Sequence, residues 1–162
     1  MLDAYIYDGL RSPFGRYVGA LATVRADDLV ATVMKALVEK HQLSADIFDE
    51  VLLGSANQAG EDSRNIARNA ALLAGLDVTT PGQTVNRLCA SGLSTVVDAA
   101  RSITCNEGDI ILAGGVESLT RAPFVFAKTE QPFSRDFKVF DTTIGSRFPN
   151  PRIIEQFGSD TM

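Results

Sequence analysis

The chain has 162 residues, a formal net charge of −5 and 45% hydrophobic residues. This composition is typical of one globular domain, and the acidic balance argues against a nucleic-acid or anionic-membrane surface. No apolar run approaches the roughly 18 residues that span a bilayer, and the acidic N-terminus does not resemble a signal peptide. We therefore expect a cytoplasmic protein.

Strands and helices are predicted to alternate along the first part of the chain. Residues 4–8 alternate in polarity and predict a short strand. Residues 27–40 carry apolar side chains at helical spacing, with acids in the first turn and Lys40 in the last. The apolar run at 50–54 predicts a buried strand, and residues 62–76 predict a helix.

A strand at 84–88, a helix at 91–104 and a strand at 109–113 complete the order β-α-β-α-β-α-β, which indicates a layered α/β domain. The helix at 91–104 contains only two charged residues, so we expect it to pack deeply in the centre of the fold. Its apolar stripe comprises Leu93, Val96, Val97, Ala100 and Ile103.

The regular pattern ends near residue 119. Seven of the nine phenylalanines lie beyond this point, among prolines, arginines and aspartates without a sustained period. A long irregular segment of this kind is uncommon inside a compact domain unless it binds a ligand or packs on a partner.

Cys89 stands where a predicted strand ends and a predicted helix begins. Unpaired N–H groups at a helix start carry partial positive charge and stabilise a thiolate, the form that attacks. The small residues Ala90, Ser91 and Gly92 allow a substrate and neighbouring backbone to approach. Cys105 would lie roughly 24 Å away at the other end of the helix, too far for a disulfide, and is interpreted as structural.

Metal binding is not expected, because one histidine, His41, and two distant cysteines cannot supply a zinc site. Most lone cysteines are inert packing residues, so the interpretation of Cys89 depends on the residues around it.

Those surrounding residues resemble the thiolase family over the whole chain. Residues 85–103, with Cys-Ala-Ser-Gly at 89–92, resemble the acyl-enzyme motif of that family. Residues 114–123 are similar to its Gly-Gly-x-Glu-Ser-Met-Ser turn, although Leu119 and Thr120 replace Met-Ser and Ser146 replaces a large aromatic residue. Further matching blocks are residues 11–16, 57–60 and 65–68.

The resemblance implies a thiolase-like layered fold, of which this chain is the N-terminal half only. Residues 1–118 would form the N-terminal α/β domain without its final strand, and residues 119–162 the beginning of the loop domain. In thiolases the loop domain shapes the acyl-CoA pocket and helps tetramers form. The C-terminal half supplies the catalytic histidine, a second cysteine as acid and base, and an Asn or His that positions an oxyanion-hole water.

The family activity is acyl-CoA C-acyltransfer. The resemblance assigns Cys89 as the nucleophile that carries the acyl thioester, with its backbone N–H in the oxyanion hole, and Met162 to substrate binding. Coenzyme A is expected as a substrate, without a tightly bound cofactor or metal. The expected partners are acyl-CoA and CoA, not nucleic acid or membrane, with a homodimer or tetramer for the full-length protein. The isolated chain is expected to be inactive.

Within the family, Asp62 and residues 64–65, 121–124, 141–145 and 147–148 are most similar to β-ketoadipyl-CoA thiolases, which form succinyl-CoA and acetyl-CoA in the breakdown of aromatic compounds. A biosynthetic acetoacetyl-CoA thiolase is the first alternative, and the direction of the reaction stays open. A non-catalytic half that acts only in association is the second alternative. A ketoacyl synthase is the third, and residues 86–92 and 114–118 fit it less well.

Overall fold

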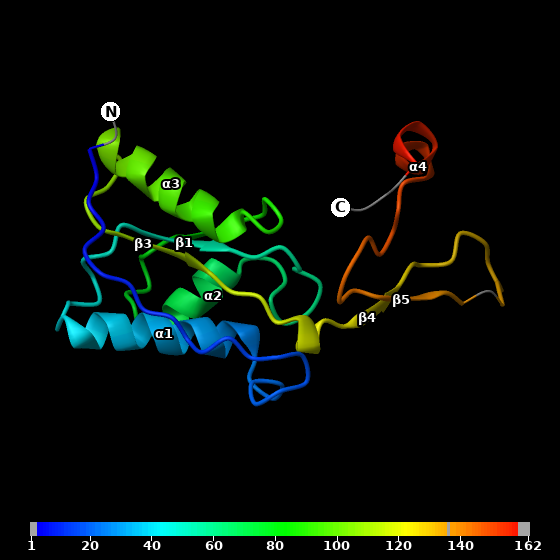
Figure 1. The fold of residues 1–162 in the computed structure, drawn as a ribbon, viewed down its shortest axis with the longest axis horizontal. Coiled ribbons are helices and arrows are strands. Elements are labelled where there is room, and N and C mark those ends of the chain that lie inside the picture. The colour runs from blue at the N-terminus through cyan, green and yellow to red at the C-terminus, as the bar shows by residue number, and fades with distance from the viewer. Residues whose placement is uncertain (1–2, 136, 159–162) are drawn as a thin grey trace.

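The computed structural model describes residues 3–135 and 137–158 (Figure 1). Helices and strands alternate up to residue 115, and a strand pair and a short helix follow a single 3-10 turn. In chain order the elements are α1 (Ala26–Lys40), β1 (Glu50–Gly54), α2 (Ile66–Leu73), β2 (Gly82–Val85), α3 (Ser91–Thr104), β3 (Ile111–Gly115), η1 (Leu119–Arg121), β4 (Phe124–Phe126), β5 (Val139–Asp141) and α4 (Pro151–Phe157).

A parallel sheet with the order β2-β1-β3 forms the middle layer of the fold. Helix α3 covers one face of the sheet, and α1 and α2 lie on the other face (Figure 1). This arrangement confirms the predicted layered α/β fold. Because the carboxyl ends of parallel strands meet at one edge, the loops after β1, β2 and β3 lie at the same end of the molecule.

Strand β1 is buried on both faces, as its apolar run predicts. Val51 and Leu53 join the hydrophobic core formed with α1 and α2, whereas Leu52 points to the opposite face because side chains alternate along a strand. The other buried members of this core are Ala26, Val30, Ala31, Met34, Phe48, Ile66, Ala67, Ala70, Ala71 and Leu76.

The predicted strand at residues 4–8 is wrong, because this segment joins no sheet. Its side chains Tyr5, Ile6 and Tyr7 are 81–91% exposed. The segment is held instead by Asp8, whose Oδ2 lies 2.6 Å from both Lys40 Nζ and His41 Nε2. A strand requires a ladder partner for its backbone groups, and no strand among the described residues pairs with this segment.

Predicted boundaries shift at three elements, at two of them because a side chain binds backbone N–H groups at the start of the element. Helix α2 begins at Ile66, and not at residue 62, since the Oδ1 of Asn65 accepts a hydrogen bond from the N–H of Arg68 at 3.2 Å. Strand β3 begins two residues late, since the N–H groups of Asp109 and Ile110 donate to the Asp49 carboxylate at 2.7 and 3.0 Å. Strand β2 ends at Val85, where a tight turn begins.

Helix α3 has the predicted bounds but is not deeply packed. Its buried side chains are small or polar, namely Ser91, Ser94, Thr95 and Ala99, whereas Leu93 is 69% exposed. The small face permits close contact with the sheet, and the Thr95 hydroxyl donates to Gly114 O at 2.8 Å. The apolar stripe is therefore left partly exposed.

Residues 124–135 and 137–158, which include the antiparallel β4–β5 pair and helix α4, extend away from the layered body (Figure 1). Their large apolar side chains are mostly exposed, and Phe133 is fully so. The chain returns to the body at Thr142, whose carbonyl accepts a hydrogen bond from the Asn57 side chain at 2.6 Å. No helix in the described ranges is long and apolar enough to span a membrane.

Candidate active site around Cys89

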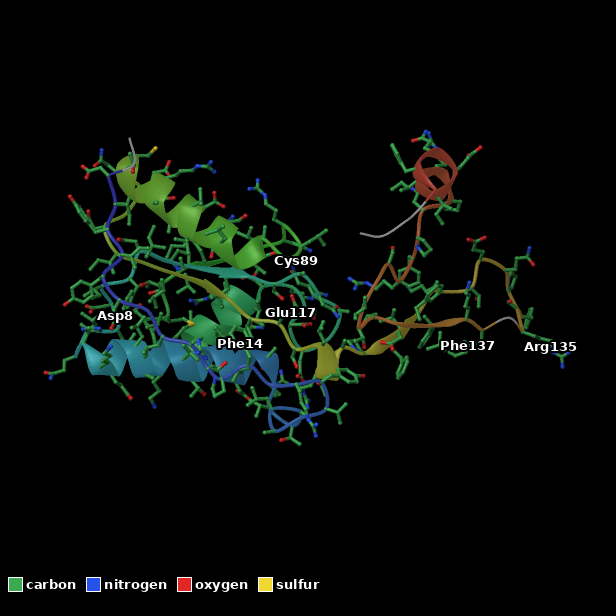
Figure 2. The ribbon with its side chains drawn as sticks, viewed as in Figure 1. Asp8, Phe14, Cys89, Glu117, Arg135 and Phe137 are labelled. Atoms are coloured by element: carbon green, nitrogen blue, oxygen red, sulfur yellow. The ribbon has the colours of Figure 1, made fainter. Side chains whose placement is uncertain are left out.

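Cys89 lies at the carboxyl end of the sheet, between β2 and α3, with an exposed and free thiol (Figure 2). Ala90 is the N-cap of α3, so the thiol stands at the positive end of a 14-residue helix. Within the described part of the chain, the backbone N–H of Cys89 donates to no acceptor. Thiol, free N–H and helix N-terminus thus meet at one exposed position.

The turn that carries Cys89 is fixed by side chains on both sides. Ser91 Oγ accepts from Arg87 N–H at 2.8 Å and donates to Leu88 O at 2.5 Å. Asn86 Oδ1 accepts from Leu88 N–H at 3.0 Å. Leu88 has a φ of +51°, in the left-handed region that non-glycine residues seldom adopt. Such strained backbone persists only where its surroundings over-determine it, as these bonds do here.

Two glycines bring the start of α3 onto the strand ends. A Cβ at Gly54 would lie 2.4 Å from the carbonyl carbon of Ser91 and 2.5 Å from Gly92 N. A Cβ at Gly115 would lie 2.9 Å from Gly54 O and 3.3 Å from the Gly92 Cα. The close backbone approach at the start of α3 thus depends on the glycines of the strands, whereas a Cβ at Gly92, near Cys89, would meet only Gly114 O at 4.0 Å.

Glu117, after β3, binds the loop after β1, and that loop in turn binds Asn86 after β2. Its carboxylate accepts from the N–H groups of Ala56 and Asn57 at 2.9 and 3.1 Å, in the loop after β1. Asn86, after β2, donates its side-chain amide to Ala56 O at 3.1 Å. Figure 2 shows Glu117 and Cys89 at the same end of the layered body.

An ion-pair network fastens the segment that follows Glu117. Arg121 donates to both carboxylate oxygens of Glu61, through Nε and through Nη2 at 2.9 Å, and Arg25 Nη1 donates to the same carboxylate at 3.2 Å. The bonds from Arg121 lower the pKa of Glu61, with a smaller contribution from Arg25 and with burial acting in the opposite direction. The network ties η1 to the start of α1.

One cavity among the described residues lies near the strand ends, but Cys89 does not line it. It has a volume of about 450 Å³ and lies between residues 10–17, helix α1 and residues 115–120. The Cys89 thiol is exposed, and Cys89 lines neither this cavity nor a second one of about 270 Å³ beside α1.

The other candidate residues lie elsewhere. Cys105 is exposed and free at the far end of α3, and its distance from Cys89 along the helix agrees with the absence of a disulfide between them. Met162 lies outside the described residues. His41, the one histidine of the chain, contacts Asp8, which lies at the opposite end of the body from Cys89 (Figure 2). No described cluster of three or more His, Cys, Asp or Glu could hold a metal ion.

Sequence reasoning assigned no role to Asn86 or Glu117 and treated Ser91 only as a small residue, although it identified the motifs that contain all three; the hydrogen bonds of Ser91 Oγ were not predicted. In the structure, Asn86 and Glu117 lie one and two residues after the ends of β2 and β3, whereas the predicted strand at 84–88 contained Asn86. At these places a polar side chain can reach the loop of a neighbouring strand.

Comparison with known proteins gives matches across the whole chain. The family model of the thiolase N-terminal domain matches residues 4–146. The 3-oxoadipyl-CoA/3-oxo-5,6-dehydrosuberyl-CoA thiolase of Escherichia coli K12 is 55% identical over 163 positions, which cover 100% of this chain and 41% of the relative. The beta-ketoadipyl-CoA thiolase of Pseudomonas putida is 54% identical with the same coverage.

A more distant match is the 3-ketoacyl-CoA thiolase of Acinetobacter baumannii strain AYE. It is 44% identical over 118 residues, which cover 72% of this chain and 30% of the relative. The chain thus spans about 40% of the length of the curated relatives that it matches along its entire sequence.

Proposed function

Because this chain belongs to the thiolase family, we propose that it forms the N-terminal part of an enzyme that transfers acyl groups between 3-ketoacyl-CoA and coenzyme A. Coenzyme A is then a substrate and not a resident cofactor. The observation that carries this proposal is the exposed Cys89 thiol at the start of α3, beside its own free backbone N–H.

In the cleavage direction, Cys89 Sγ attacks the 3-keto carbon of the substrate. The bond between C2 and C3 then breaks, and the two-carbon fragment leaves as the enolate of acetyl-CoA, which takes up a proton. The acyl thioester left on Cys89 passes to the thiol of a second coenzyme A, which restores the cysteine. The Cys89 N–H would donate to the oxyanion that forms at the attacked carbon.

The acid and base groups of this reaction are proposed to come from a C-terminal half. The one histidine of this chain contacts Asp8 at the end of the body remote from Cys89 (Figure 2). A thiol nucleophile of this kind is activated by an adjacent base, and none of the described residues hydrogen-bonds to the Cys89 thiol.

The proposed substrate is β-ketoadipyl-CoA, which gives succinyl-CoA and acetyl-CoA. Relatives that bear this name are 53–55% identical to the chain over nearly all of its length. A biosynthetic acetoacetyl-CoA thiolase is the alternative, since the nucleophile and the strand-end loops would serve either acyl chain.

Residues 1–118 are proposed to be the N-terminal α/β domain, and residues 119–162 the beginning of a loop domain. The β4–β5 pair and α4 extend from the layered body with exposed aromatic side chains, which suits a segment that packs on another surface (Figure 1). Strands β2 and β3 are the edges of the sheet. Unpaired edges favour association, and a homodimer or tetramer of the full-length protein is proposed.

The nucleophile is tested by brief iodoacetamide treatment of the folded chain near neutral pH, followed by peptide mapping. Cys89 should be labelled faster than Cys105, because Cys105 lies at the negative end of the same helix. Variants Cys89→Ser and Cys105→Ser each leave one thiol and serve as matched controls. Faster labelling of Cys105 would contradict the assignment.

The activity is tested in a chimera in which this chain replaces the corresponding N-terminal 41% of the Escherichia coli relative. The chimera should cleave β-ketoadipyl-CoA faster than acetoacetyl-CoA, and Cys89→Ala should abolish both reactions. Preference for acetoacetyl-CoA would support the alternative substrate. A folded chimera that cleaves neither substrate would refute the proposed function.

A further inference from the structure

We infer that Glu117 is a positioning residue that holds Cys89 in its reactive orientation through Asn86. This inference rests on the proposed role of Cys89 as a nucleophile. Glu117 itself contacts neither the thiol nor a reacting atom in this scheme. It acts on the loop after β1, and that loop acts on the turn that carries Cys89.

The first contact is a carboxylate bound by two successive backbone N–H groups. Glu117 Oε2 accepts from Ala56 at 2.9 Å and Oε1 accepts from Asn57 at 3.1 Å. Successive N–H groups of this kind form a concave site for an anion. Glu117 makes no ion pair with any described residue. Its carboxylate binds the backbone N–H groups of this loop instead.

The second contact carries the constraint from the β1 loop to the β2 loop. Asn86 uses both ends of its side-chain amide: Nδ2 donates to Ala56 O at 3.1 Å, and Oδ1 accepts from Leu88 N–H at 3.0 Å. Ala56 is therefore held by Glu117 through its N–H and by Asn86 through its carbonyl. Asn86 connects this fixed peptide to the residue that directly precedes Cys89.

The residue that these contacts hold in place, Leu88, has a strained backbone conformation. Leu88 adopts a left-handed φ of +51°, a conformation that is strained for a residue other than glycine. If Leu88 relaxed, the direction of the next peptide would change, and with it the direction of the Cys89 N–H and side chain. Ser91 braces the turn from the helix side, whereas the Asn86 and Glu117 contacts brace it from the sheet side.

The test compares the alkylation rates of Cys89 and Cys105 in Glu117→Ala, Glu117→Gln, Asn86→Ala and Asn86→Asp. Cys105, at the far end of α3, is the internal reference. The Cys89-to-Cys105 ratio should fall about 3- to 10-fold in Glu117→Ala and Asn86→Ala, the range of one net hydrogen bond. Asn86→Asp keeps the acceptor for Leu88 N–H but loses the donor to Ala56 O, and should fall between the wild type and Asn86→Ala.

The double variant Glu117→Ala/Asn86→Ala distinguishes a shared path from two separate effects. Its ratio should be close to that of Asn86→Ala alone, because contacts in series are not additive. Glu130→Ala removes an exposed carboxylate from the extending segment and should leave the ratio unchanged. A ratio is used because a loss of stability alone changes the labelling rates of both thiols together. Its pH dependence is recorded for every variant.

The outcomes separate this inference from the proposed function. If wild-type Cys89 does not react faster than Cys105, the nucleophile assignment fails. If wild-type Cys89 is the faster thiol and the ratio is unchanged or higher in the Glu117 and Asn86 variants, the positioning role is refuted and the nucleophile stands. Should Glu117→Ala not fold, Glu117→Gln and Asn86→Asp decide the question by the same ratio.

Discussion

Gly54→Ala tests the close packing of α3 on the sheet. The added Cβ would lie 2.4 Å from Ser91 C, about 1 Å inside the distance at which ordinary van der Waals contact begins, and the obstructing atoms are backbone. Backbone cannot rotate out of the way as a side chain does, so β1 and α3 must separate. Overpacking of this kind costs about 1–3 kcal/mol. With a urea dependence of about 2 kcal/mol/M, the unfolding midpoint should fall by roughly 0.5–1.5 M.

Gly114→Ala is the matched control, one strand away. The nearest atom to its added Cβ is Leu53 Cδ2 at 3.6 Å, an ordinary contact. Its unfolding midpoint should stay near that of the wild type or rise, because alanine restricts the unfolded chain more than glycine does. Equilibrium urea unfolding followed by circular dichroism measures both variants. Equal stability of Gly54→Ala and Gly114→Ala would refute the argument that backbone contact at Gly54 sets the position of α3.

Three further outcomes are expected. The 162-residue chain alone should show no CoA-dependent cleavage of a 3-ketoacyl-CoA above background, because its one histidine contacts Asp8 and not the proposed nucleophile, Cys89; measurable turnover by chain free of other thiolase would contradict this. Sedimentation over a wide concentration range should show association, driven by the unpaired sheet edges and the exposed face of α3; a cooperatively folding monomer at all concentrations would argue against it. Hydrogen bonds from Lys40 and then His41 lower the pKa of Asp8, so the anchor of the N-terminal segment should persist at pH 5–8 and weaken only below about pH 4, the usual carboxylate range. Amide-proton NMR of Gly9, whose N–H donates to Asp8 at 2.7 Å, reports this, and release near pH 6 would be inconsistent with it.

Elements specified by local pattern were predictable from the sequence. The apolar spacing of residues 27–40 and the run at 50–54 match α1 and β1 within one residue, and the bounds of α3 are those predicted. The position of Cys89 at the start of α3 follows directly from those bounds. In each case the pattern is complete within one stretch of chain, so no distant residue is needed to define the element.

Features that depend on distant residues were not predictable from local pattern. The start of β3 depends on Asp49, about 60 positions away, which binds the two N–H groups before it. The buried face of α3 is decided by Gly54 and Gly115, which lie in other strands. Periodicity indicates that a helix has an apolar stripe, but close packing on glycine-containing strands turns the small side chains inward.

The contact between Glu117 and the Ala56 loop also has a consequence for synthesis of the protein. Glu117 follows Cys89 in the chain, so the ribosome makes the cysteine 28 positions before the carboxylate that braces its turn (117 less 89). At about 5–20 residues per second, the interval is roughly 1–6 s. During that time the nascent chain holds the cysteine without its brace from β3. The thiol therefore acquires its oriented form late, only after the third strand of the sheet has emerged and paired.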